Sequence, residues 1–238
     1  MNVFLLPRST TEELQRIMNS FWWGSNPNGN RGIKWLSWDR LCAPKQTGGM
    51  WFRNLKSFNL AMLGKQAWNL IAKPDSLMTR VLKAKYFPNS NFLDASLGHN
   101  PSFIWRSLWS SRIIIKRGVR WRIGKGDKIN VWREPWLRDP RNFYITTPPI
   151  TELHSLKVCD LFIPFTTQWD HELLDDIFGN TDVHEILNIH VHTNIGGDQL
   201  IWHYSSNGKY QVRSGYKIAQ ELLSDDVVPT GHGEWQKL

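Results

Sequence analysis

The chain has 238 residues, 41% of them hydrophobic and 13% aromatic, and a formal net charge of +8. This composition excludes a disordered chain, and the length allows one large domain or two small ones. No apolar run is long enough to span a membrane or to serve as a signal peptide, and Glu12 and Glu13 are unlike an acid-poor mitochondrial transit helix. We therefore expect an intracellular protein without membrane contact, in the nucleus or cytoplasm rather than the mitochondrion.

The charge divides the chain into two parts. Residues 1–141 hold 24 Lys/Arg against 8 Asp/Glu, whereas residues 142–238 hold 5 against 13. The Pro-rich stretch 139–149 coincides with the reversal, so we predict a basic, Trp-rich module over residues 1–141 and an acidic module over 142–238. Alternatively, the opposite charges neutralise each other across an internal interface.

In the first half, hydrophobic spacing predicts four helices. The first begins near Ser9 or Thr10, with Thr10 and Glu13 as a capping box, and carries an apolar stripe to Phe21. A short strand or extended segment, 33–38, precedes a turn-rich connector. Three more helices are predicted over 55–72, over 76–86 after a cap at Asp75, and from Asn100-Pro101 onward. The buried face expected for the helix at 76–86 is Leu77, Val81 and Leu82.

In the second half, short elements alternate. Two strand-like stretches around a glycine-rich turn predict a hairpin over 118–136. Helices are expected over 158–162, 171–178, 183–189 and 214–223, and a second hairpin pairs 199–203 with 209–212. The predicted fold class is α+β, helical on its N-terminal side and followed by short β-hairpins and helices.

The region from Arg106 to Arg141 concentrates positive charge, with eleven Lys/Arg opposed by three acids. A cationic strip that carries tryptophans suits a polyanion with stackable bases, so it predicts weak, non-specific binding to RNA or DNA. Alternatively, this is a Trp-rich core hairpin with a solvated basic edge. The candidate binding residues are Arg106, Arg112, Lys116, Arg117, Arg120, Trp121, Arg122, Lys125, Lys128, Trp132 and Arg133.

Other motifs predict no chemistry. Asp175-Asp176 and Asp225-Asp226 lack the aromatic residue and the flanking strands of a polymerase metal site, so they are expected to be acids on helix surfaces or ends. Two distant cysteines and a His190-Val191-His192 pair do not make a zinc site. The turn 124–127 lacks the Lys-Ser/Thr ending and the helix of a phosphate loop. We expect no catalytic activity, no metal, no cofactor and no small-molecule substrate.

The chain resembles the region downstream of the polymerase domain in plant non-LTR (LINE-type) retrotransposon reverse transcriptases. The resemblance covers nearly the whole chain and is carried by FWWGS at 21–25, IKWLSWDRLCAPKQTGGM at 33–50, FNLAMLGKQAWNLI at 58–71, RVLKAKYFP at 80–88, GHNPSFIWRSLW at 98–109, RGVRWRIGKGDKINVWREPWL at 117–137 and GKYQVRSGYKIA at 208–219. Trp51 departs from the family, which usually has a glycine at this point. The family's zinc-binding region normally follows, and its cysteine and histidine ligands are not in this sequence.

The resemblance implies a non-catalytic piece of a reverse transcriptase that holds template RNA or target DNA through backbone contacts and stacking. In that case residues 1–87 form a thumb-like helical connector. The alternatives are a degenerate retroelement reading frame without retained function, or a remnant that binds another protein.

Overall fold

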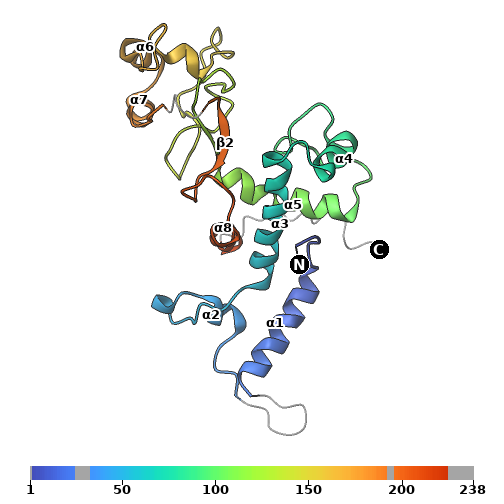
Figure 1. The fold of residues 1–238 in the computed structure, drawn as a ribbon. Coiled ribbons are helices and arrows are strands. Elements are labelled where there is room, and N and C mark those ends of the chain that lie inside the picture. The colour runs from blue at the N-terminus through green and yellow to red at the C-terminus, as the bar shows by residue number, and fades with distance from the viewer. Residues whose placement is uncertain (1, 25–32, 192–195, 225–238) are drawn as a thin grey trace. The chain divides into compact units, whose positions relative to one another are not determined.

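The computed structural model describes residues 2–24, 33–191 and 196–224. Within them the chain is mixed α+β and mostly helical, which confirms the predicted fold class: eight α-helices accompany one two-stranded antiparallel sheet (Figure 1). It forms two compact units, unit 1 (Met1–Arg117 with Gln211–Leu238) and unit 2 (Gly118–Tyr210). This division rests on compactness, and the boundary that charge predicts between residues 141 and 142 stays a prediction.

Unit 1 is helical. Its elements are α1 (Arg8–Trp22), α2 (Trp38–Cys42), η1 (Lys45–Thr47), α3 (Leu55–Ala72), α4 (Leu77–Tyr86), α5 (Phe103–Gly118, which ends at the border with unit 2) and α8 (Val212–Ser224). None of the helices in the described ranges is both long and apolar enough to cross a membrane.

The core of unit 1 forms around α3. This helix begins where the side chain of Asn54 accepts a hydrogen bond from the backbone N–H of Ser57, and it buries Leu60, Leu63 and Ala67. Helix α8 packs along α3, and the hydroxyl of Tyr216 accepts a hydrogen bond from the Asn54 backbone at 2.9 Å. The strong apolar periodicity at 55–72 therefore predicts the central helix correctly.

Two local predictions in unit 1 are wrong, and a third holds in one of its two alternatives. Helix α1 begins at Arg8 after Pro7 without a side-chain cap, so the capping box at Thr10 does not form. Residues 33–37 form no strand, so of the two predicted alternatives only the extended segment stands, and Trp38 begins α2, which Ser37 caps. In α4, capped by Ser76 rather than Asp75, Leu77 is 76% and Val81 56% exposed, and of the predicted buried face only Leu82 is half-buried.

Unit 2 holds the sheet and short helices. Its elements are β1 (Val119–Arg122), η2 (Val158–Leu161), α6 (His171–Ile177), α7 (Asn180–Leu187) and β2 (Gln199–Trp202). Strand β1 pairs antiparallel with β2, with Val119 opposite Trp202 and Arg122 opposite Gln199. The two expected local hairpins are therefore wrong in their pairing, because the first strand of each pairs with the other across 77 residues of sequence.

The core of unit 2 is built from aromatic and branched side chains. Ile129, Val131 and Trp136 are fully buried, together with Leu161, Leu174 and Ile186 from η2, α6 and α7. The indole N–H of Trp136 donates to the carbonyl of Val131 at 2.8 Å, so its polar atom is satisfied inside the core.

A buried carboxylate organises the glycine-rich turn. Asp198 Oδ1 accepts hydrogen bonds from the backbone N–H groups of Gly124 and Gly126, both at 2.8 Å, and Oδ2 accepts from Lys128 at 3.0 Å. Burial raises the pKa of Asp198, but these N–H groups outweigh it and the net pKa is lowered. The turn therefore binds an anionic group, and that group is the side chain of Asp198.

A second buried carboxylate, Asp182, anchors the segment at Thr146 and Thr147, which precedes η2. Asp182 on α7 accepts hydrogen bonds from the backbone N–H and hydroxyl groups of both Thr146 and Thr147. Burial raises the pKa of Asp182, and these donors together lower that pKa by more, so the net change is a decrease. Both carboxylates are therefore bound in their charged form.

We predict that Asp198→Asn lowers the free energy of unfolding by about 2–3 kcal/mol near pH 7, because an amide nitrogen then faces a backbone N–H donor. The folded-state pKa lies below the unfolded one, so this stabilisation is present above about pH 4 and is lost as the pH falls through the folded-state pKa. Urea unfolding at pH 7 and pH 3.5 measures it. The control is Asp175→Asn, at an exposed position on α6. An equal loss at both pH values would contradict the prediction.

A second prediction concerns Trp51. Its φ of 59° lies in the left-handed region, where an indole side chain is strained and the glycine of the resembled family is not. Its ring is 53% exposed, so Trp51→Gly should raise the free energy of unfolding by about 0.5–1 kcal/mol. Gly48→Ala is the matched control: φ is 82° and a Cβ would meet nothing within 4 Å, so it should cost about 1 kcal/mol through strain alone. A clear destabilisation by Trp51→Gly would mean that the ring packs more strongly than its exposure suggests.

Candidate functional site

Four of the candidate residues, Arg106, Arg112, Lys116 and Arg117, lie on α5 in unit 1. Arg112 is tied into the fold: its guanidinium donates to the carbonyl of Ala95 and lies 4.6 Å from the ring of Trp109. Burial lowers its pKa, and the charge of Asp94 partly offsets this. Lys116 and Arg117 are exposed at the C-terminal end of the helix, where cations interact favourably with the negative end of the helix dipole.

The two candidate tryptophans pack against the core of unit 2. The indole N–H of Trp132 donates to the carbonyl of Thr147 at 3.0 Å, and its ring lies 5.8 Å from that of Phe178. Trp121 donates its indole N–H to Glu134 at 2.7 Å. Both rings are only partly buried. The placement favours the packing alternative, and base stacking by either ring stays a prediction.

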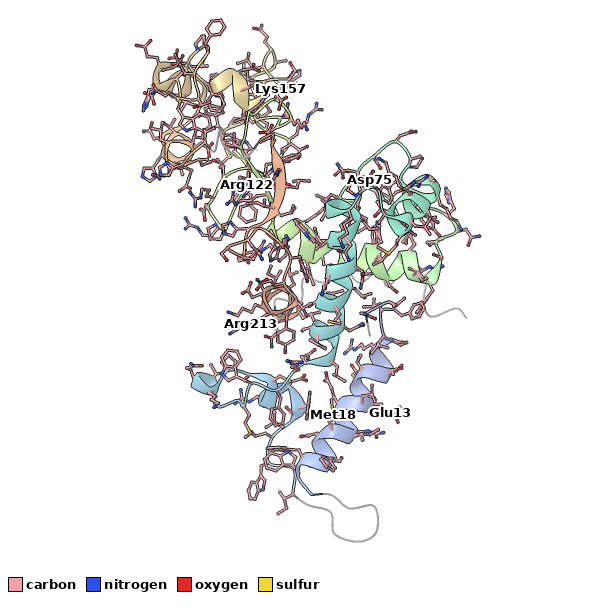
Figure 2. All side chains as sticks on the ribbon, viewed as in Figure 1. Glu13, Met18, Asp75, Arg122, Lys157 and Arg213 are labelled. Atoms are coloured by element: carbon pink, nitrogen blue, oxygen red, sulfur yellow. The ribbon has the colours of Figure 1, made fainter. Side chains whose placement is uncertain are left out.

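The remaining candidates are all in unit 2. Lys125, Lys128 and Arg133 are exposed on the loops that follow β1. Arg120 and Arg122 lie on β1 itself, where Figure 2 labels Arg122 beside the two-stranded sheet. Side chains alternate between the two faces of a strand. Arg120 and Arg122 are two residues apart, so their side chains lie on the same face.

That face holds a depression of about 450 Å³, which we call the arginine pocket. It brings together β1, β2 and the turn after β2, and it is lined by Arg120, Arg122, Arg138, Ile201, His203, Tyr204, Ser205, Ser206 and Gly208. Three arginine side chains and two serines therefore line one small volume.

Arg120 is held in place by neutral acceptors. Its Nε donates to Nδ1 of His203 at 3.0 Å, and its Nη1 donates to the carbonyl of Trp121 at 3.2 Å. Burial, followed by the charges of Arg138 and Arg122, lowers its pKa to about 10. Burial and the charges of Arg120 and Arg138 likewise lower the pKa of His203, so the imidazole is neutral near pH 7 and accepts the hydrogen bond.

The nearby acids are bonded elsewhere. Glu134 accepts from Trp121, and Asp139 forms an ion pair with Arg141 at 2.9 Å. Asp198 is enclosed by the turn at 124–128. The groups that shift the pKa of Arg120 and His203 are burial and arginines, with no carboxylate among them. Among the residues that the structure describes, the arginine pocket is thus a concentration of positive charge without an internal counter-ion.

Residues with catalytic or metal-binding potential are dispersed. In the part of the chain that the structure describes, no three His, Cys, Asp or Glu side chains form a group that could hold a metal ion. Asp175 and Asp176 are exposed on α6, as expected, while Asp225-Asp226 and His192 lie outside the described residues. Cys42 and Cys159 are free thiols, and burial followed by the charge of Asp39 raises the pKa of Cys42 to about 12.

Of the residues that line the pocket, only Arg120 and Arg122 are among the candidates predicted from the sequence; Arg138, His203 and Ser206 are among those that are not. Arg138 lies within the basic strip, so its charge was a usable signal. His203 and Ser206 come from a turn more than 60 residues away, and only the pairing of β1 with β2 brings them to the arginines.

Comparison with known proteins identifies relatives in plants. Over 140 residues, 58% of this chain, the sequence is 39% identical to the "Uncharacterized mitochondrial protein AtMg00310" of Arabidopsis thaliana, 90% of which is covered. The chain therefore belongs to the same family as that protein. No family model and no solved structure matches the chain.

A second relative is longer. Over 236 residues, 96% of this chain, the sequence is 30% identical to the "Putative ribonuclease H protein At1g65750" of Arabidopsis thaliana. The chain spans 37% of the length of that relative. The two relatives are consistent with a retroelement-derived protein.

The third prediction concerns Trp132, whose ring packs within unit 2. Removing a ring that packs on Phe178 and satisfies the Thr147 carbonyl should leave a cavity and an unpaired acceptor, so Trp132→Ala should cost about 3 kcal/mol of unfolding free energy. Thermal unfolding measures the loss, and strand binding is assayed well below the melting temperature. Loss of binding with unchanged stability would instead establish base stacking. Trp35→Ala serves as the control, since Trp35 is 71% exposed.

Proposed function

We propose that this chain is a non-catalytic, retroelement-derived domain that binds nucleic acid weakly and without sequence preference. In this proposal it corresponds to the region that follows the polymerase in LINE-type reverse transcriptases. The observation that carries the proposal is the arginine pocket, in which three guanidinium groups repel one another and no carboxylate of the described chain neutralises them. A phosphate would supply the missing counter-charge.

The exposed cations around the pocket extend the same surface. Residues 118–141 contain seven Lys/Arg and three acids, whereas residues 142–198 contain one lysine and nine acids. Two of the three acids in the first segment, Glu134 and Asp139, are engaged by Trp121 and Arg141. Positive charge within unit 2 is therefore concentrated in one segment, which supports binding to a polyanion although the unit as a whole is acidic.

Non-specific contacts explain the expected affinity. Guanidinium and ammonium groups that bind phosphates carry no sequence information, and such contacts give dissociation constants of about 10⁻⁴–10⁻⁶ M at physiological salt. Four or five phosphate contacts to a single strand predict a log–log salt slope of about −3.

The test is the salt dependence of binding to a labelled 12-nucleotide single strand, as RNA and as DNA. A quadruple variant that replaces two pocket arginines and two exposed loop lysines with glutamine should bind less tightly and flatten the slope by about 0.7 for each phosphate that it no longer neutralises. Its substitutions are Arg122→Gln, Lys125→Gln, Lys128→Gln and Arg138→Gln. Arg120 is retained because its hydrogen bonds to His203 and Trp121 also support the fold.

A matched variant controls for net charge. It removes four exposed lysines from unit 1: Lys45→Gln, Lys65→Gln, Lys73→Gln and Lys83→Gln. It should leave the slope nearly unchanged. If both variants weaken binding equally, the pocket is not the site; if the parent chain binds no strand, the alternative of a relic without retained function, or one that binds another protein, becomes the better account.

A further inference from the structure

The arginine pocket differs from an open basic strip in its shape. Its volume of about 450 Å³ is lined from three directions, by β1, by β2 with the turn to Gly208, and by Arg138. Arg120 is partly buried in it, whereas Lys125, Lys128 and Arg133 stand on exposed loops. A ligand that reaches Arg120 must therefore enter a depression, while a ligand that contacts the lysines need only pass along the surface.

The donors in the pocket are partly committed and partly open. Arg120 uses Nε and Nη1 for His203 and Trp121, and Nη2 has no acceptor among the residues that the structure describes. Arg138 makes no hydrogen bond or ion pair with any part of the described chain, although its charge acts on Arg120 and His203. The hydroxyl of Ser206 is likewise exposed at the pocket.

The charge of the pocket distinguishes between kinds of phosphate. An internal phosphodiester carries one negative charge and has a sugar on each side, so the strand must both enter and leave. A terminal phosphate monoester carries a charge of about −1.5 to −2 near pH 7, has three terminal oxygens and is attached on one side only. Three guanidinium groups in a depression match the monoester better in charge, in acceptor number and in access.

We propose that the arginine pocket binds the terminal phosphate monoester of a nucleic-acid strand, while the lysines of the 124–128 turn contact internal phosphates. This inference rests on the proposed function and adds to it a preference for strand ends. The pocket guanidinium groups give the preference, and the exposed loop cations give the affinity that all strands share.

The experiment compares three 12-nucleotide single strands of one sequence, with a 5′-phosphate, with a 3′-phosphate, or with hydroxyl groups at both ends. Dissociation constants are measured by fluorescence anisotropy with an internal label. At least one phosphorylated strand should bind about fivefold or more tightly than the hydroxyl strand. Arg138→Gln should bring this ratio close to 1. Arg138 is exposed, and an unchanged melting temperature would show that the variant is folded.

Lys125→Gln is the matched control, since it removes one exposed charge from the same unit outside the pocket. It should weaken binding of all three strands by a similar factor and preserve the ratio. Equal binding of all three strands by the parent chain would overturn the inference and leave the proposed function intact. A preference for phosphorylated strands that survives Arg138→Gln but is lost with Lys125→Gln would also overturn the inference. That result would place the terminal phosphate at the 124–128 turn instead of in the pocket.

Two further probes separate the possible sources of a phosphate monoester. Inorganic phosphate and a nucleoside monophosphate should compete with the phosphorylated strand only at much higher concentration, because neither reaches the loop lysines. If the mononucleotide binds more tightly than the strand, the pocket serves a free nucleotide and the strand-end inference is wrong. If no strand binds while inorganic phosphate shifts the amide signals of residues 203–208, the proposed function fails and the phosphate specificity of the pocket is upheld.

Discussion

The architecture of unit 2 depends on the hydrogen bonds that the carboxylate of Asp198 accepts. The carboxylate joins the residue just before β2 to the turn just after β1 through three backbone N–H groups, across about 70 residues of sequence. Because this bond network adjoins the paired strands, it fixes where β2 and its following turn lie relative to Arg120 and Arg122. It also has an electrostatic consequence: the carboxylate of Asp198 is enclosed by backbone donors of the turn and is not an ion-pair partner of the arginines.

Interactions between residues close in sequence explain why several elements could be predicted from the sequence. The helix at 55–72 has a continuous apolar face and an asparagine cap, and α6 and α7 follow similar short-range signals, so no distant partner is needed to specify them. The pairing of β1 with β2 is different in kind. A strand of four residues has an alternation pattern but carries no information about its partner, and the glycine-rich turn that suggested a local hairpin is instead closed by Asp198.

The candidate site could be predicted in part, for the same reason. Charge density along the chain identifies the segment that holds Arg120, Arg122 and the exposed lysines, since this is a local property of the sequence. It cannot separate Arg112, which donates to the Ala95 carbonyl, from arginines that face solvent. Charge density also does not identify His203, Ser205 or Ser206, because these residues reach the pocket only through the pairing of β1 with β2. The abundance of tryptophan pointed to stacking, but the indole N–H groups of Trp121 and Trp132 already have partners within unit 2.

The central claim is that the arginines of the pocket bind phosphate in the intact chain, and nuclear magnetic resonance observes those groups directly. A titration of ¹⁵N-labelled protein with a single-stranded oligonucleotide should shift the side-chain Nε–Hε signals of Arg120, Arg122 and Arg138 together with the amides of residues 203–208. The Nε–Hε signal of Arg112 in unit 1 should stay in place, because its guanidinium is bonded to Ala95. Shifts at Arg112 or on unit 1 alone, with the signals of the pocket unchanged at saturation, would contradict the account.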